Sequence, residues 1–365
     1  MLRVCFLFSL FALSHAVILS NSVILTSADV PQTTQAQIYS TQTGLYNGAM
    51  YRVFGTFASG NTAEYASRVI VSDNYGYSFT LARLAQAKPG SDYILSDINF
   101  LKAPIQIWDQ NTGARVPFTL YIVDASIVNY PVASAQLAAG AIDSQYGFWA
   151  AGITVLSAEK YFTMFNFDIG SFPSLYVSSV GFDELSSDYR IMYMRSQSEA
   201  RISFVTIYGP IATLYNSNIG SSRFQFQFTK NTPYSNQLSP GASFAFLSPG
   251  YLSRSDSYKL PYTISEAYDR AYTFGDSNWM YADYQAFLDN PTTLQLRFTS
   301  SGGDNRDVVS TSDEQNHGEA FGNRISLNVN TNGGRPPRFL YKITSSSALS
   351  FSFLGMLLVA PFSTF

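Results

Sequence analysis

The chain has 365 residues, and its 22 basic and 25 acidic side chains leave a net charge of −3 at pH 7. Charged residues make up 13% of the sequence, against roughly 25% in an ordinary soluble protein. Because there is neither a net positive charge nor a basic run, the composition argues against nucleic-acid binding and against electrostatic attachment to a membrane surface. Aromatic residues reach 16%, which indicates aromatic-rich cores beneath a neutral polar surface.

The N-terminus has the pattern of a secretory signal peptide. Arg3 precedes an apolar run over residues 4–13, and Ser14 and Ala16 supply the small residues that a signal peptidase reads. The run is too short to cross a bilayer, which needs roughly 20 apolar residues. We therefore predict a signal peptide over residues 1–16 and a secreted protein that loses Cys5, its one cysteine, on cleavage.

The first predicted domain covers residues 17–130 and is expected to end near Tyr130-Pro131. Turn residues separate short apolar segments throughout it, which is typical of a β-sandwich. The expected strands are Arg68–Ser72 and Tyr77–Ala82, and the clearest hairpin joins Ile105–Trp108 to Val116–Ile122.

Residues 131–342 form a further β-rich domain or a pair of domains. The strongest strand signal is the alternation of three Phe with Gln at residues 224–228, and similar alternation recurs at 294–298 and 325–329. Further strands are expected at Tyr161–Phe167, Leu175–Val180, Tyr189–Met194, Arg201–Tyr208 and Phe244–Leu247. Helical signal is limited to Val132–Ala139 and Trp279–Leu288. The sequence therefore predicts an all-β protein of two or three antiparallel β-sandwich units, jelly-roll-like, with little helix.

No catalytic constellation stands out. Once the signal peptide is removed, His317 is the only histidine, and no Gly-x-Ser-x-Gly sequence is present to carry a serine nucleophile. Carboxylate pairs of the kind that glycosidases use occur in any chain, and Asp183 with Glu184 or Asp283 with Asp289 is better explained as loop and helix-end charge. We therefore predict that the protein is not an enzyme, has no catalytic residues and uses no cofactor.

One segment is dense in oxygen ligands. Asp304, Asp307 and Asp313 lie there among other acidic, amide and glycine residues. Ca²⁺ takes about six to eight oxygen ligands, but the spacing does not match an EF-hand. The three aspartates are weak candidate metal ligands, and a long solvated hairpin loop is the favoured interpretation. No metal site is predicted.

A second segment concentrates aromatic residues. Trp279, Tyr281 and Tyr284 combine large apolar rings with polar tips, which suits stacking on sugars or anchoring of a protein partner. Packing within a sheet is the favoured alternative, so the ligand-binding residues stay unassigned.

Residues 343–365 form a mostly apolar tail that carries no charge from Ala348 onward. A spanning helix normally stops against Lys or Arg, and none follows the apolar stretch here. A glycosylphosphatidylinositol (GPI) signal combines small residues at the attachment site, a polar spacer and an apolar tail of roughly 10 to 20 residues. This pattern favours a GPI anchor at Asn332, or at Ser345 with almost no spacer. An uncleaved membrane-inserted tail and a buried final strand pair are the alternatives.

Three short motifs of the first domain, Val71–Gly76, Tyr93–Ser96 and Pro117–Ile122, follow one another in a layout that resembles the CUB-like domains of secreted nematode proteins. The resemblance covers the N-terminal third of the chain. It implies a non-enzymatic extracellular protein of a kind frequently associated with innate host defence and membrane rafts. No functional residues transfer, because the cysteines and calcium-binding acidic residues of better understood CUB domains have no matched positions here.

Two functions from different classes are therefore expected. The first is a GPI-anchored binding or structural protein at the outer face of the plasma membrane, or in the extracellular space, that recognises a protein or glycan. The alternative is a secreted glycan hydrolase that uses a carboxylate pair. The sequence names neither the ligand nor the oligomeric state.

Overall fold

Most of the described structure is β-strand, arranged in several antiparallel sheets with very little helix, which confirms the predicted all-β class. The structure is a computed structural model, and it describes residues 22–34, 45–58, 63–127, 130–137, 141–143, 152–159, 161–168, 175–183, 190–194, 204–215, 225–229, 237–238, 243–247, 267–287, 293–299, 303, 305–310, 314–330 and 338–346. The chain divides into two compact units. Unit 1 comprises Met1–Pro233 and Phe246–Glu266, and unit 2 comprises Tyr234–Ala245 and Ala267–Phe365.

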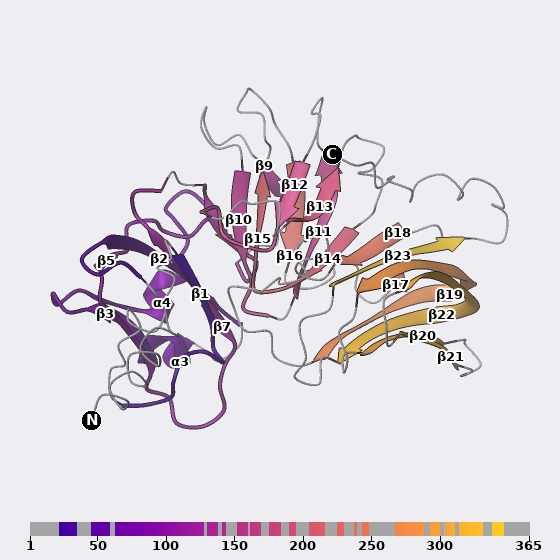
Figure 1. Cartoon of the computed structure of the whole chain (residues 1–365), viewed down its shortest axis with the longest axis horizontal. Helices are drawn as coiled ribbons and strands as arrows, with labels where there is room; N and C mark the ends of the chain where they lie inside the picture. Colours follow the sequence, from indigo (N-terminus) through magenta and orange to yellow (C-terminus); the bar gives the residue numbers. More distant parts are fainter. Residues whose placement is uncertain are drawn as a thin grey trace, which may run out of the picture. The chain divides into compact units, whose positions relative to one another are not determined.

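Unit 1 begins with two sheets packed face to face (Figure 1). The first has the order β1-β7-β2-β5, with β1 at Ser22–Thr26, β7 at Phe118–Asp124, β2 at Met50–Phe57 and β5 at Phe100–Lys102. The second has the order β4-β3-β6, with β4 at Ser78–Thr80, β3 at Val69–Asp73 and β6 at Ile105–Asp109. Two short helices, α3 (Ala63–Arg68) and α4 (Leu81–Leu84), accompany them. Side chains of both sheets share one core, so this part is a β-sandwich.

Strand β7 explains how a second core arises in the same unit. Its residues alternate between two faces, as in any strand, yet both faces are buried. Leu120 and Ile122 belong to the core of the sandwich, whereas Tyr121 and Val123 belong to a second core. That second core also contains residues from beyond position 130: Val132, Leu156, Phe182 and Ile211.

The rest of unit 1 consists of two further sets of strands. One sheet has the order β13-β12-β15-β10-β8, with bounds Arg190–Met194, Leu175–Ser178, Ile211–Tyr215, Gly152–Leu156 and Val132–Ser134. The other set has the order β14-β11-β16-β9, with bounds Phe204–Tyr208, Tyr161–Asp168, Gln225–Thr229 and Ala141–Asp143. The junction predicted near Tyr130-Pro131 lies inside unit 1, between the sandwich and β8.

Unit 2 is built around two long strands, β19 (Ala267–Phe287) and β22 (Glu314–Asn330). The strand order there is β21-β20-β22-β19-β23, with β21 at Asn305–Ser310, β20 at Thr293–Thr299 and β23 at Arg338–Ser346. Figure 1 shows β19, β22, β20 and β21 running side by side. Strand β17 (Gln237–Leu238) pairs with β19, and β18 spans Ser243–Leu247.

Three local predictions are wrong. The helix expected at Trp279–Leu288 is strand β19 as far as Phe287, because β22 and β23 pair with its two edges. The helix expected at Val132–Ala139 begins as strand β8, which pairs with β10, and continues as a turn to Leu137. The predicted hairpin does not form, because β6 pairs with β3 whereas β7 pairs with β1 and β2.

Candidate functional site

A carboxylate organises the turn between β3 and β4. Oδ1 of Asp73 accepts hydrogen bonds from the backbone amides of Tyr75 and Tyr77, at 2.9 and 3.0 Å. Oδ2 accepts from the backbone amide of Lys102 in β5, at 3.1 Å. Asp73 therefore fixes the turn and ties it to the edge strand of the other sheet. An ionised carboxylate that accepts three backbone hydrogen bonds is strongly held in one orientation.

We call the residues of this turn and of the adjoining strands β2 and β5 the β5 rim: Met50, Tyr75, Tyr77, Phe100 and the part-buried Lys102. Tyr75 and Tyr77 are 58% and 65% exposed, and Met50 and Phe100 are also exposed. The Lys102 ammonium lies 4.7 Å from the centre of the Tyr75 ring, and Lys102 is the cross-strand partner of Met50. The β5 rim thus combines aromatic rings on the turn with a cation on β5, which suits recognition of a sugar or a protein.

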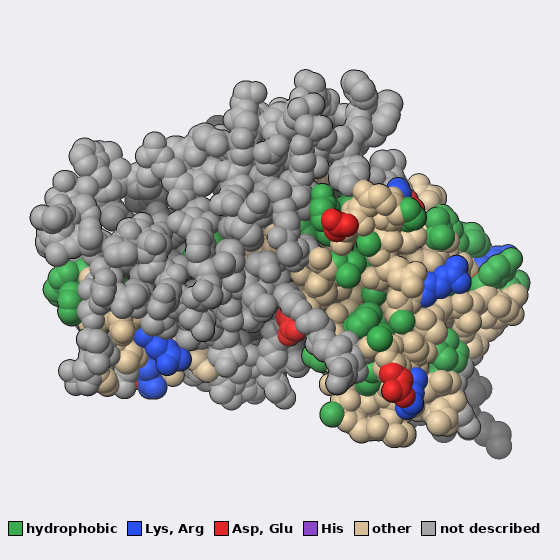
Figure 2. All heavy atoms as spheres, turned by 180° about the vertical axis from the view of Figure 1, so that it is seen from behind, with side chains coloured by type: hydrophobic (Ala, Val, Ile, Leu, Met, Phe, Trp, Pro, Cys, Tyr) green, Lys and Arg blue, Asp and Glu red, His purple; other side chains and the backbone are tan. Residues whose placement is uncertain are grey.

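Charge is sparse around this and other described surfaces. On the face shown in Figure 2, acidic and basic side chains stand singly or in small groups among hydrophobic and uncharged areas. One opposite-charge pair on unit 1 is Glu64 with Arg68 in helix α3. Recognition at such a surface depends on shape and on apolar contact more than on net charge.

A buried polar cluster lies at the second core of unit 1. The Tyr121 hydroxyl donates to Oδ1 of Asp183 over 2.5 Å, and burial raises the pKa of Tyr121 well above its ordinary value. Arg52 is buried beside it, donates to the Ile127 carbonyl and lies over the Phe182 ring. Burial lowers the pKa of the Arg52 guanidinium. These groups join β2 and β7 to the segment after β12, so the cluster is a structural tie.

A second buried carboxylate closes the end of β6. Oδ1 of Asp109 accepts from the backbone and side-chain amides of Asn111, and Oδ2 accepts from the Tyr65 hydroxyl. The side-chain amide of Asn111 also donates to the Tyr65 carbonyl. Burial and the bond to Asp109 raise the pKa of Tyr65 to about 12. Asp109 therefore fastens helix α3 to β6 and is committed to structural bonds.

The candidate metal ligands do not converge among the described residues. Asp304 and Asp313 lie outside them, and Asp307 stands in β21. Both carboxylate oxygens of Asp307 accept from Arg297, at 2.7 and 2.8 Å, and Oδ2 also accepts from Gln295. The hydrogen bond from Arg297 holds the pKa of Asp307 below its ordinary value. Over the described residues, no group of three potential metal ligands is found.

The long loop expected around the three aspartates is largely strand. Residues Asn305–Ser310 are β21, which pairs with β20, and β22 begins at Glu314. The interpretation as a solvated loop is therefore wrong for these residues.

The residues that the sequence analysis weighed for catalysis lie in both units, Asp183 in unit 1 and Asp283 and His317 in unit 2. The strand register sets His317 opposite Asp283 in the β19–β22 pair, and Asp283 opposite Lys342 in the β19–β23 pair. Asp183 is bound by Tyr121. Glu184 and Asp289, the second members of the two weighed carboxylate pairs, lie outside the described residues.

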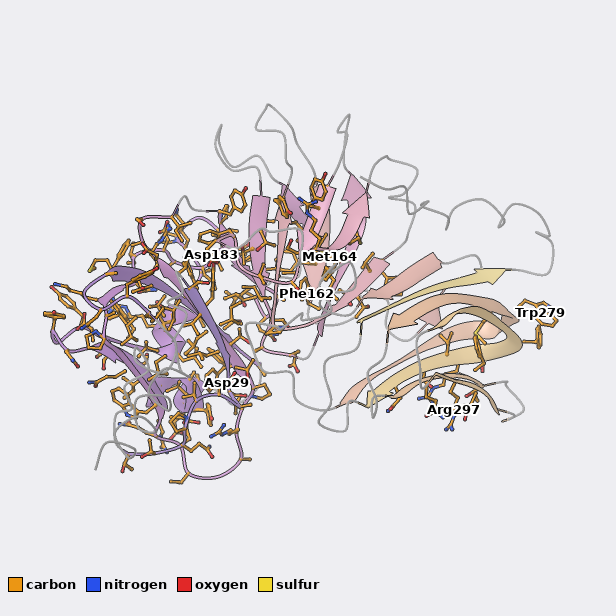
Figure 3. All side chains as sticks on the ribbon, viewed as in Figure 1. Asp29, Phe162, Met164, Asp183, Trp279 and Arg297 are labelled. Carbon is orange, nitrogen blue, oxygen red and sulfur yellow. The ribbon has the colours of Figure 1, made fainter. Side chains whose placement is uncertain are left out.

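An exposed aromatic pair lies on unit 2. Trp279 in β19 and Phe321 in β22 are cross-strand partners whose ring centres lie 5.9 Å apart, in an edge-to-face arrangement. They are 38% and 53% exposed, whereas the neighbouring Met280 is fully buried. Figure 3 shows the Trp279 side chain projecting outward from the long strands. The sequence singled out Trp279 but not Phe321, because their proximity depends on the register of β22.

Strand β23 contains one of the two candidate anchor residues and follows the other in the chain. Ser345 lies within it, opposite Met280, and Ser346 is its last residue, opposite Trp279. Strand β23 thus contains the first four residues of the expected tail, 343–346. Asn332 and the apolar stretch from Ala348 lie outside the described residues. Among the helices that are described, none has the length and apolar character that crossing a membrane requires.

Sequence reasoning missed the β5 rim. The signal was present in part, because Asp73 followed by Asn74 and Gly76 is typical of a carboxylate-capped turn. The third bond of Asp73, to Lys102, was not predictable from that segment, since it depends on the packing of two sheets.

Comparisons with known proteins identify no relative. No family model matches the chain, and no curated protein matches it. Among solved structures, an uncharacterised protein of Listeria monocytogenes, lmo2446, in complex with glucose, magnesium and calcium, matches at a TM-score of 0.21 and 6% identity; the match covers 72% of this chain and 29% of that one. A mutant oxalate decarboxylase of Bacillus subtilis matches at a TM-score of 0.13 and 13% identity, and the match covers 53% of this chain and 65% of that one. The structure of the entire lipid-containing bacteriophage PM2 matches at a TM-score of 0.11 and 8% identity, and the match covers 82% of this chain and 99% of that one.

Proposed function

We propose that the protein is a non-enzymatic, extracellular binding protein that a GPI anchor displays on the cell surface. The observation that carries the proposal is the course of the chain through β23, a strand hydrogen-bonded to β19 up to Ser346. The apolar stretch begins two residues later, at Ala348. The folded part of unit 2 would thus be joined almost directly to the signal for lipid attachment.

The same strand favours one of the two candidate attachment residues. Attachment at Asn332 would remove every residue that follows, and with them the whole of β23. The edge of β19 from Trp279 to Phe287 would then lose its hydrogen-bonding partner, which is unfavourable for a folded sheet. Attachment at Ser345, or at a neighbouring serine, keeps β23 almost complete. We therefore assign the anchor to the serine run rather than to Asn332.

The β5 rim is the proposed ligand-binding surface. Its Tyr75 and Tyr77 rings are exposed, and three backbone bonds to Asp73 hold the turn that bears them. A rigid turn loses little conformational entropy when it binds. Exposed tyrosines next to Lys102 offer apolar area, hydroxyl groups and one cation, which fits a glycan or a neutral protein surface.

A non-enzymatic role is supported by what three carboxylates of unit 1 do. Asp73 and Asp109 each accept several hydrogen bonds that close a turn or a strand end, and Asp183 binds the buried phenol of Tyr121. The resemblance to CUB-like domains extends the proposal to innate host defence. The alternative, a secreted glycan hydrolase, requires polysaccharide hydrolysis by the purified protein that is lost on a single Asp→Asn change.

Phosphatidylinositol-specific phospholipase C tests the anchor. Cells that express the full chain are treated with the enzyme, and the protein is followed in the medium and the membrane fraction. We expect release into the medium, and a C-terminal peptide that ends at Ser345, Ser346 or Ser347 and carries ethanolamine phosphate. A control chain that stops at Ser347 should be secreted without treatment. Retention in the membrane, with peptides from residues 348–365 still detected, would overturn the proposal.

A further inference from the structure

An arginine at the start of strand β13 is held in place by two tyrosines. Arg190 is the first residue of β13, the edge strand of its sheet. Its Nε donates a hydrogen bond to the hydroxyl of Tyr215 in β15 over 3.0 Å. The guanidinium carbon lies 4.4 Å from the centre of the Tyr176 ring in β12, and the two tyrosine rings are stacked with their centres 5.4 Å apart. One edge and one face of the guanidinium are therefore occupied, which fixes its orientation.

The charge of Arg190 has no acidic partner among the residues that the structure describes. None of the ion pairs found there includes Arg190, and Nε is the only guanidinium nitrogen with a hydrogen-bond partner in that part of the chain. The side chain is part-exposed. Its terminal nitrogens carry two parallel N–H groups, which form the edge of a guanidinium that can pair with both oxygens of a carboxylate. Arg190 is therefore a cation that is held in one orientation and still open to an anion.

A third tyrosine lies next to this pair. Gly152 is the cross-strand partner of Tyr215, and a Cβ atom there would lie 2.8 Å from the Tyr130 ring and 2.9 Å from Cβ of Tyr215. Tyr130 thus packs beside Tyr215 across the bare backbone of Gly152. Burial, and then the nearby Tyr215 phenol, raise the pKa of Tyr130, so its hydroxyl stays protonated at neutral pH. Tyr130 is part-exposed, and its hydroxyl has no hydrogen-bond partner among the described residues.

We propose that Arg190 binds the acidic group of a saccharide, either a carboxylate or a sulfate ester. Each of these groups carries a single negative charge, which the single charge of Arg190 matches, and each offers two oxygens to the parallel N–H groups. A phosphate group carries about −1.5 to −2 charges at pH 7, so part of its charge would stay unmatched here. The hydroxyl of Tyr130 offers a donor and an acceptor to a sugar hydroxyl.

The two stacked tyrosines are positioning residues. Because Tyr176 and Tyr215 already hold the guanidinium of Arg190, little side-chain freedom is lost when a ligand binds. The site is built from β12, β13 and β15. It shares no residue with the β5 rim, and it does not depend on the lipid anchor.

A glycan array tests this inference on protein purified from cells that express the full chain. The array holds saccharides with uronic acids, saccharides with sulfate esters and the neutral counterparts of both. Arg190→Gln removes the charge, Arg190→Lys keeps the charge without the parallel N–H groups, and Tyr215→Phe removes the hydroxyl that holds Nε. Arg83→Gln is the matched control, because Arg83 is exposed and also lies over an aromatic ring, that of Phe79.

We expect the wild type and Arg83→Gln to bind acidic saccharides in preference to the neutral ones. Binding should be about ten-fold weaker in Arg190→Gln and Arg190→Lys, because a charged hydrogen-bonded pair is lost, and several-fold weaker in Tyr215→Phe. The saccharides that lose their signal show whether the bound group is a carboxylate or a sulfate ester.

Three results would overturn the inference: no acidic saccharide bound, equal binding of every saccharide by the wild type and Arg190→Gln, or tighter binding of the acidic peptide tetraglutamate than of any saccharide. Urea midpoints of all variants are measured alongside. If Arg190→Gln unfolds at lower urea than the wild type, Arg190→Lys takes its place in the comparison.

Discussion

Tyr121 and Gly181 fit against each other in the second core of unit 1. A Cβ atom added at Gly181 would fall inside contact distance of the Tyr121 hydroxyl and ring, whose hydroxyl donates to Asp183 two residues further on. Tyr121 belongs to β7 and Gly181 follows β12. The absence of a side chain at 181 is therefore what lets the phenol reach its carboxylate.

Gly181→Ala should destabilise unit 1 by about 1 to 3 kcal/mol, because the added methyl group overpacks a buried contact. Thermal and urea unfolding of the purified protein measure the change. Tyr121→Phe is the companion variant, which removes the hydroxyl but keeps the ring. It should cost about 1 to 3 kcal/mol, because the Asp183 carboxylate loses its phenol donor. An unchanged midpoint for Gly181→Ala would mean that the ring moves aside freely.

Asp73→Ala should loosen the β5 rim. The change leaves the backbone amides of Tyr75, Tyr77 and Lys102 without their acceptor, at a cost of about 2 to 4 kcal/mol. Hydrogen exchange at these three amides should speed up more than exchange in β7. Asp73→Asn is the matched control: it keeps one carbonyl oxygen and should lose protection mainly at Lys102. Equal exchange in all three proteins would contradict the assigned role.

Tyr65 should contribute to a loss of stability at alkaline pH. Its pKa is raised to about 12 in the folded state, against about 10 in an unfolded chain. The folded state therefore favours the neutral phenol, and this contribution is complete below pH 10 and disappears as the pH rises through about 12. Urea midpoints of the wild type and Tyr65→Phe should differ more at pH 9 than at pH 11.5. Tyr77→Phe, at an exposed ring, is the control. If the difference in urea midpoint between the wild type and Tyr65→Phe grew as the pH rose, the predicted direction of the pH dependence would be wrong.

Arg297→Ala should have little effect on stability and a clear effect on Asp307. The ion pair is exposed, and such pairs contribute little because water and salt screen them. The pKa of Asp307 is held below its ordinary value mainly by the hydrogen bond from Arg297, so it should rise towards that value in the variant. Carbon-13 NMR of the carboxyl group during a pH titration measures this. Gln295→Ala, which removes the smaller contribution of the Gln295 hydrogen bond, should shift the pKa of Asp307 less.

Truncation should separate the two candidate anchor residues. A chain that stops at Asn332 lacks all nine residues of β23, and with them backbone hydrogen bonds to β19 that together contribute about 5 to 10 kcal/mol. We expect it to be retained in the cell or degraded, whereas a chain that stops at Ser347 should be secreted and fold. Secretion yield and protease resistance of the two chains provide the measurement. Equal yields of folded protein would remove the argument against Asn332.

The sequence alone determined the fold class and many of the strands. The alternation at residues 224–228, 294–298 and 325–329 predicted strands that are present as parts of β16, β20 and β22. That success has a local cause, because the period of two is written in neighbouring side chains. The alternation predicted that these segments are strands, but not which strands they pair with.

What the tertiary structure decided was pairing. Residues 105–108 and 116–122 were predicted to form a hairpin, yet the strands found there, β6 and β7, belong to different sheets. The helix predicted at 279–288 is strand as far as Phe287, because β22 and β23 pair with its two edges. The same holds for the candidate sites. Asp73 meets Lys102, and Trp279 meets Phe321 and Ser346, only through register between distant segments. Local periodicity fixes which face a side chain takes, whereas its neighbours come from long-range packing, which one segment of sequence does not contain.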